Sequence, residues 1–168
     1  MKLGNIIRLF MPLYLLISIG ASAQSAKKEK EQARYAQLKT AVDSREYVFN
    51  AQSATSMGGR TRQLTGSYTT KVHGDSLDVY LPYFGRAYSA TPGDTNGGIN
   101  FSTSSFTYEC HDAKSGGWLI LITPADQKNA NKIQISITSS GYATVQVTSN
   151  NRQLISFYGN ISTDSKSR

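Results

Sequence analysis

The sequence predicts a mainly β protein of the α+β class: one amino-terminal helix, then an antiparallel meander of about eight to ten strands, sandwich-like or barrel-like. Residues 25–44 contain no glycine or proline and are rich in good helix formers. From residue 45 onward, short runs of alternating apolar and polar residues are separated by turn residues. No helical pattern interrupts these runs, whereas parallel strands need long crossover connections.

The first 23 residues have the parts of a secretory signal peptide. Lys2 and Arg8 give a basic start, an apolar run follows, and Ala21-Ser22-Ala23 offers the small residues that signal peptidase accepts. The apolar run is about half of the roughly 20 residues that span a bilayer, so cleavage after Ala23 is favoured over a retained anchor. Gln24 follows the cut, and lipid attachment there would need a cysteine. We therefore expect an exported protein, periplasmic or secreted, with no transmembrane anchor after processing.

The remaining chain has the length of one domain. The predicted parts are a signal peptide (1–23), an amino-terminal helix (24–44), a single antiparallel β domain (45–162) and a polar tail (163–168). In the helix, Tyr35, Leu38 and Val42 recur at three- and four-residue spacings and form a narrow apolar stripe. The stripe predicts docking on the β domain, because a helix lying on a membrane surface needs a broader apolar face.

The formal net charge is +7, and many of the basic residues lie in the helix and at the carboxyl terminus. A solvated helix face and a polar tail explain them, so no nucleic-acid partner is predicted. Cys110 is the only cysteine, which excludes an internal disulfide. It shares strand parity with Phe106 and Tyr108, and this pattern predicts a buried, inert thiol rather than a nucleophile.

Three segments give the clearest strand and turn predictions. Residues 64–72 and 77–81 alternate on either side of His73-Gly74-Asp75-Ser76, which is typical of a hairpin with a two-residue turn. The alternation places Tyr80 on the opposite face from Val79 and Leu81. Residues 118–122 are apolar on both faces and predict a central strand. Asn150-Asn151 predicts another tight turn, leading into a last strand that begins near Arg152.

The chemically densest stretch is Leu81-Pro82-Tyr83-Phe84-Gly85-Arg86-Ala87-Tyr88, followed by a glycine-rich loop at residues 90–100. Proline suits a strand end and glycine permits a sharp bend, so the favoured interpretation is an aromatic corner that fixes the sheet. The functional alternative is a small ligand-binding site with four members: Tyr83, Phe84, Arg86 and Tyr88. Arg86 has no evident structural role, and its planar guanidinium suits stacking or a carboxylate.

Catalytic and metal chemistry have little support in the sequence. The two histidines, His73 and His111, have no cysteine or carboxylate set at ligand spacing, so no metal and no cofactor are predicted. No Gly-x-Ser-x-Gly motif occurs, and no catalytic residue is assigned. The alternative is a hydrolase whose site is assembled near His111 from residues such as Ser105, Glu109 and Asp112.

Several stretches carry a family resemblance through their order along the chain. They are the signal peptide, the helix, the stretch 81–88, Gly97-Gly98 with Phe101, Ser140-Gly141-Tyr142-Ala143, Asn151-Arg152-Gln153 and Phe157-Tyr158-Gly159. Together they resemble the exported bacterial family catalogued as domain of unknown function 4251, typical of Bacteroidetes, over most of the mature chain. The resemblance implies an exported, largely β-stranded protein without an assigned activity, and it supplies no catalytic residues.

The predicted function is therefore that of an exported, non-enzymatic binding or envelope-associated β domain. Its partner would be an unknown ligand or a component of the cell envelope. A hydrolase with a site near His111 is the first alternative. A purely structural envelope component, in which the conspicuous aromatic residues only build the core, is the second.

Overall fold

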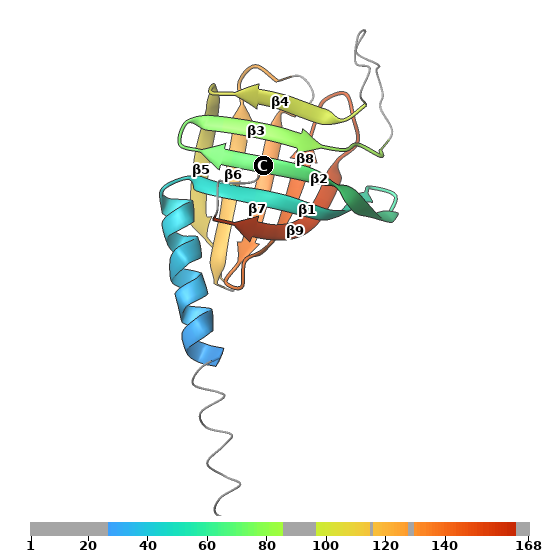
Figure 1. The fold of residues 1–168 in the computed structure, drawn as a ribbon. Coiled ribbons are helices and arrows are strands. Elements are labelled where there is room, and N and C mark those ends of the chain that lie inside the picture. The colour runs from blue at the N-terminus through green and yellow to red at the C-terminus, as the bar shows by residue number, and fades with distance from the viewer. Residues whose placement is uncertain (1–26, 86–96, 115, 128–129, 164–168) are drawn as a thin grey trace, which may run out of the picture.

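A computed structural model describes residues 27–85, 97–114, 116–127 and 130–163 (Figure 1). The predicted fold class is confirmed, because one helix at residues 27–43 precedes nine antiparallel strands in this part of the chain. The strands are β1 (Glu46–Ser56), β2 (Thr61–His73), β3 (Ser76–Leu81), β4 (Ile99–Thr103), β5 (Phe106–Asp112), β6 (Gly117–Pro124), β7 (Lys132–Thr138), β8 (Tyr142–Thr148) and β9 (Ile155–Ser162).

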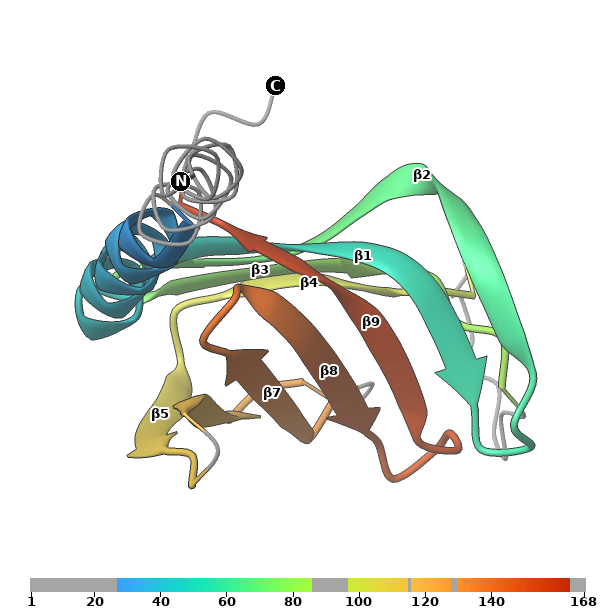
Figure 2. The same ribbon diagram turned by 90° about the horizontal axis from the view of Figure 1, so that it is seen from below.

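All nine strands form one sheet in the order β4-β3-β2-β1-β9-β8-β7-β6-β5. Two meanders, β1 to β4 and β5 to β9, are joined by the pairing of β1 with β9. Figures 1 and 2 show β1 to β4 crossing over β5 to β8, so the sheet folds on itself into a nearly closed, barrel-like shape. Although β4 and β5 are consecutive in the chain, they are the two edges of the sheet.

A bulge in β1 allows this folding. The register of β1 against both β2 and β9 shifts between Ala51 and Ser53. A bulge bends its strand and increases the local twist. Figure 2 shows β1 curving from the upper layer toward the lower one, and β9 follows it.

The core lies between the two layers. The alternation in β3 is as predicted, with Val79 and Leu81 buried and Tyr80 exposed on the outer face. The largest fully buried side chains come from both layers and from the helix: Phe49, Phe157, Leu77, Leu81, Ile99, Ile120, Ile122, Ile133, Ile135, Ile137, Ile155 and Val42. The predicted strand at residues 118–122 forms most of β6, an interior strand that pairs with β5 on one side and with β7 on the other.

The helix docks on the β domain through the predicted stripe. Leu38 and Val42 are buried in the same core cluster as the strands, and the Tyr35 ring stacks on Trp118 at a centroid distance of 5.2 Å. Figures 1 and 2 show the helix against the end of the fold where β1 begins. Arg45 ends the helix in a left-handed conformation (φ 57°) and turns the chain into β1.

A tyrosine pair lies beside the helix. The Tyr47 and Tyr108 hydroxyls are 3.3 Å apart, and the Arg45 guanidinium covers the Tyr108 ring at 4.6 Å from its centroid. Burial raises the pKa of Tyr108 to about 12 and raises the pKa of Tyr47 well above its usual value. Both rings therefore stay neutral throughout the physiological range and act as packing and hydrogen-bonding groups.

Candidate functional site

The predicted aromatic stretch lies at the end of the fold opposite the helix. Leu81 ends β3, Pro82 is buried beyond it, Tyr83 is half-buried and Phe84 is exposed. The other two predicted members of the ligand site, Arg86 and Tyr88, lie outside the described residues. The structure therefore describes half of the predicted site.

Tyr83 is locked into a corner. Its hydroxyl donates a hydrogen bond of 3.0 Å to the carbonyl of Gln153, and the Arg152 guanidinium lies 5.0 Å from its ring centroid. A Cβ at Gly85 would collide with the Tyr83 hydroxyl, so a larger residue there would have to displace the tyrosine side chain. Tyr83 therefore has the structural role that the sequence analysis favoured, that of an aromatic corner which fixes the sheet.

Arg152 connects the corner to the start of β4. Its side chain is buried, and Nη1 donates to the carbonyls of Gly97 (3.1 Å) and Gly98 (2.9 Å). The predicted turn at Asn150-Asn151 does join β8 to β9, but it is not tight, because β8 ends at Thr148 and β9 begins only at Ile155. The intervening residues are held by these contacts instead, which fixes three distant segments at one place.

A hollow with an aromatic wall lies beside this corner, and we call it the aromatic hollow. It has a volume of about 350 Å³ and is lined by Tyr68, Tyr80, Leu81, Pro82, Tyr83, Phe84, Gly97, Gly98 and Asn100. Tyr68 and Tyr80 stack at a centroid distance of 5.5 Å, and the Arg62 guanidinium lies 5.0 Å from the Phe84 centroid. Tyr80 is 52% exposed and Phe84 41%, so both rings present open surface.

A second hollow of about 560 Å³ adjoins the first through Phe84. Met57, at 71% exposure, and Arg60 border it from the turn between β1 and β2, and Gln153 borders it from the other side. The exposed rings and the methionine form an apolar surface edged by guanidinium and amide groups. Apolar and aromatic surface beside a few polar groups is the usual composition of a small-molecule site.

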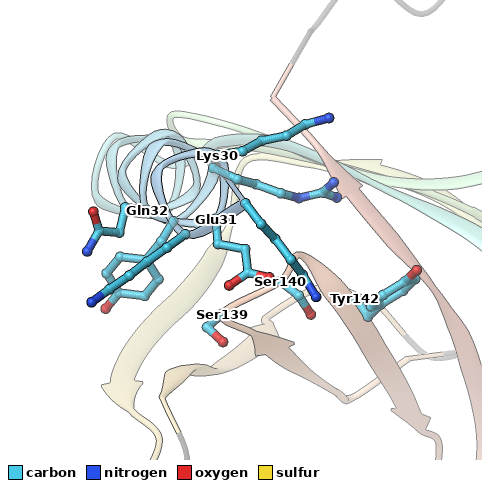
Figure 3. Close-up of a pocket in the computed structure, with 10 residues that line it drawn as sticks. Lys30, Glu31, Gln32, Ser139, Ser140 and Tyr142 are labelled. Atoms are coloured by element: carbon cyan, nitrogen blue, oxygen red, sulfur yellow. The ribbon is translucent and has the colours of Figure 1, made fainter. Parts of the chain in front are cut away.

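A larger hollow lies at the other end, between the helix and the turn that joins β7 to β8, and we call it the helix groove. Its volume is about 680 Å³. Lys27, Lys28, Lys30 and Arg34 line it together with Glu31, Gln32, Tyr35, Ser139, Ser140 and Tyr142. Figure 3 shows Glu31 reaching from the helix toward Ser139 and Ser140. One wall of the groove thus consists of long, solvated side chains from the exposed first turns of the helix.

The β5 residues of the predicted hydrolase alternative are divided between the two faces of the strand. His111 and Glu109 lie on one face of β5, with His111 Nε2 and Glu109 Oε2 3.7 Å apart, and both side chains are well exposed. Asp112 alternates to the other face, where it faces Trp118 of β6 in the ladder. Among the described residues, no group of three histidine, cysteine, aspartate or glutamate side chains is placed to hold a metal ion.

The prediction of a buried Cys110 is wrong, since the thiol is exposed. The parity was correct, and Cys110 pairs with Ile120 on the inner face of the sheet. Its exposure follows from the position of β5 at the sheet edge. Partial burial and the nearby Asp112 carboxylate raise the pKa of the thiol, which disfavours the nucleophilic thiolate.

The sequence indicated one wall of the aromatic hollow and missed the rest. Tyr80 was recognisable because it alternates with Val79 and Leu81, which face the core. Tyr68 shares parity with the core residues of β2, so nothing in the alternation marked it. Arg152 contacts Gly97 across 55 positions of the chain, a proximity that only the folded sheet creates.

Comparison with known proteins assigns the family. Residues 29–161 match the family model described as Domain of unknown function (DUF4251). The chain belongs to the DUF4251 family. A crystal structure is known for another DUF4251 family protein, from Bacteroides eggerthii, whose sequence is 18% identical to this one. The two structures match with a TM-score of 0.55 over 77% of this chain and 87% of that chain. At this identity the likeness shows the shared fold.

The family resemblance expected from the sequence is thereby confirmed. A comparison with curated protein sequences gave no match. Within the described part of this DUF4251 protein, no helix is both long and apolar enough to cross a membrane.

Proposed function

We propose that this DUF4251 protein is an exported, non-enzymatic binding domain that holds its ligand in the aromatic hollow. The observation that carries the proposal is the exposed aromatic wall, in which Tyr80 and Phe84 present open ring surface beside a rigid corner. Rings that serve only the core are buried, as Phe49 and Phe157 are. The exposed rings have no such duty and are available for a ligand.

Rigidity favours the aromatic hollow over the larger helix groove. In the hollow, Tyr83 is fixed by Gln153 and Arg152, and the backbone at Gly97 is held by Arg152. A preformed site loses less conformational entropy when it binds. Three lysines form much of the wall of the helix groove, and each of them would have to be immobilised.

The chemistry of the hollow fits a glycan. A sugar ring offers an apolar face of C–H groups, which stacks on tyrosine or phenylalanine, and a polar edge of hydroxyl groups. The Asn100 amide, at the rim, supplies both a donor and an acceptor for such an edge. The predicted signal peptide supports a cell-envelope glycan, because an exported chain would meet such glycans directly.

Binding is tested with soluble peptidoglycan fragments and with neutral and acidic oligosaccharides, using calorimetry and thermal shift. We expect binding by the wild type, loss of at least about tenfold in affinity for Tyr80→Ala and Phe84→Ala, and no change for Tyr158→Ala. Tyr158 is the control, because it is also exposed and stacked on a tyrosine, Tyr142, but borders none of the hollows described above. Arg86→Ala measures whether the arginine singled out in the sequence contributes.

Two results would overturn the proposal. One is the failure of every glycan to bind a folded protein. The other is binding that persists in both Tyr80→Ala and Phe84→Ala. Export is tested separately by cell fractionation and by the intact mass of the exported protein, which should begin at Gln24; a cytoplasmic protein that retains Met1 would contradict it.

A further inference from the structure

The edge strand β5 is open to pairing. In the described part of the chain, β5 pairs only with β6, and every one of its residues is exposed or half-buried. Its register against β6 runs from Phe106 to Asp112 without a bulge. The strand contains no proline and no lysine, two residue types that block unwanted pairing at sheet edges.

The other edge is protected. β4 spans only Ile99–Thr103, and both of its terminal side chains are buried. The backbone just before it is held by Arg152 through the carbonyls of Gly97 and Gly98. Short edge strands whose ends are held in place are poor templates for pairing. The β4 edge is therefore protected from pairing, whereas the β5 edge is open to it.

The hairpin hydrogen bonds show which backbone groups of β5 face outward. Ala113 donates to the carbonyl of Gly117, and Ala125 donates to that of Ser105. In an antiparallel ladder, alternate residues bond to the same neighbour. The odd-numbered residues of β5 therefore bond to β6. The even-numbered ones direct their N–H and C=O groups to the free edge: Phe106, Tyr108, Cys110 and Asp112.

A second copy of β5 satisfies these outward groups in a specific register. Because only the even-numbered residues direct hydrogen-bonding groups to the free edge, two antiparallel copies must pair even-numbered residues with even-numbered residues. A two-fold axis at Glu109 places two carboxylates directly opposite each other, which is unfavourable. An axis at Cys110 places Glu109 of one copy opposite His111 of the other, and it does so twice.

We propose that the protein forms a symmetric dimer in which two β5 strands pair antiparallel about Cys110. The two sheets then become one continuous sheet across the interface. The exposed Cys110 thiols lie opposite each other, with Cα atoms about 5.5 Å apart as in any hydrogen-bonded antiparallel pair. Cys110 is thus a built-in reporter of the interface.

The mass of the purified protein is measured by sedimentation equilibrium over a range of concentrations, and Cys110 is cross-linked with a short bismaleimide. We expect a dimer mass and a covalent dimer that is lost in Cys110→Ser. Asp112→Pro removes one outward N–H and leaves the bonds to β6 intact, so it should shift the protein to monomer. His111→Glu places like charges opposite each other twice and should raise the dissociation constant by about three- to tenfold.

The matched control is the charge exchange. Combining Glu109→Lys with His111→Glu restores opposite charges across the interface and should recover the dimer that His111→Glu alone weakens. Circular dichroism verifies that each variant is folded. If Asp112→Pro does not fold, His111→Glu alone still tests the interface. A protein that is monomeric throughout, a dimer that resists both variants, or a dimer whose Cys110 thiols do not cross-link would overturn the proposal.

Discussion

The two ends of the barrel-like sheet both gather aromatic rings and arginines, and they use them differently. At the helix end, Tyr47 and Trp118 are 2% and 3% exposed, and Arg45 covers the Tyr108 ring. At the opposite end, Tyr80 and Phe84 are 52% and 41% exposed. The same residue types therefore stabilise the fold at one end and present a surface at the other.

The difference follows from what covers each end. The docked helix removes the rings at its end from water, and each fully buried ring contributes apolar area to stability. At the open end, Arg152 fixes the backbone at Gly97 and Gly98, and the rings of Tyr80 and Phe84 remain partly exposed. Substitutions at the helix end should thus lower stability. Substitutions on the rings of the aromatic hollow should lower binding.

The largest expected effect is that of Trp118→Ala. This change leaves a cavity in the core and removes the stacking partner of Tyr35, so it should lower the free energy of unfolding by about 3–5 kcal/mol. Urea unfolding measures the loss. A loss below about 1 kcal/mol would show that the helix does not seal this end.

The next largest effect is that of Arg152→Ala. This change leaves the Gly97 and Gly98 carbonyls without the hydrogen bonds from Arg152 and removes the guanidinium from the Tyr83 ring. We expect a loss of about 1.5–3 kcal/mol, together with weaker ligand binding as the hollow loses its support. Arg152→Lys should recover only part of the loss, since it retains the charge without the planar guanidinium. Full recovery would indicate that charge alone matters.

Tyr47→Phe tests the tyrosine pair beside the helix. Loss of its hydroxyl contact with Tyr108 should lower stability by about 0.5–1.5 kcal/mol near neutral pH. The raised pKa values mean that the fold favours neutral tyrosine, so this stabilisation is complete below about pH 10 and declines as pH rises toward 12. Alkaline melting curves of the wild type should fall steeply in that window, and those of Tyr47→Phe less steeply. Identical slopes would contradict the assignment.

The smallest expected stability effects are those of Tyr80→Ala and Tyr158→Ala. Each removes one ring of an exposed stacked pair, worth about 0.5–1.5 kcal/mol. Similar losses of stability in both variants would show that the two pairs contribute equally to the fold. The pairs would then differ only in ligand binding. If Tyr80→Ala lowered stability as much as is expected for Trp118→Ala, the Tyr80 ring would be a structural residue rather than part of a binding surface.

Alternation along single strands carried much of the prediction. It placed Val79 and Leu81 inward and Tyr80 outward, and the helical spacing of Leu38 and Val42 identified the docked face. It failed where the position of a strand within the sheet decides the outcome. Cys110 has core parity but lies on an edge strand, so its thiol is exposed.

The candidate site was less predictable than the fold, because its residues converge from distant segments. Phe84 was identified within its dense stretch, whereas Tyr68 and Arg152 join it only through strand pairing and a side chain that reaches across the corner. Periodicity assigns a residue to a face, but it does not say which remote segment will lie beside it.

The central claim, that the open end holds the ligand, is tested most directly by mapping backbone amide chemical shifts while a binding oligosaccharide is titrated into the isotope-labelled protein. The account predicts that the largest changes lie around Tyr68, Tyr80, Phe84 and Asn100, and that Tyr80→Ala abolishes them. Changes centred instead on Tyr35, Ser140 and Tyr142, in the helix groove, would contradict it.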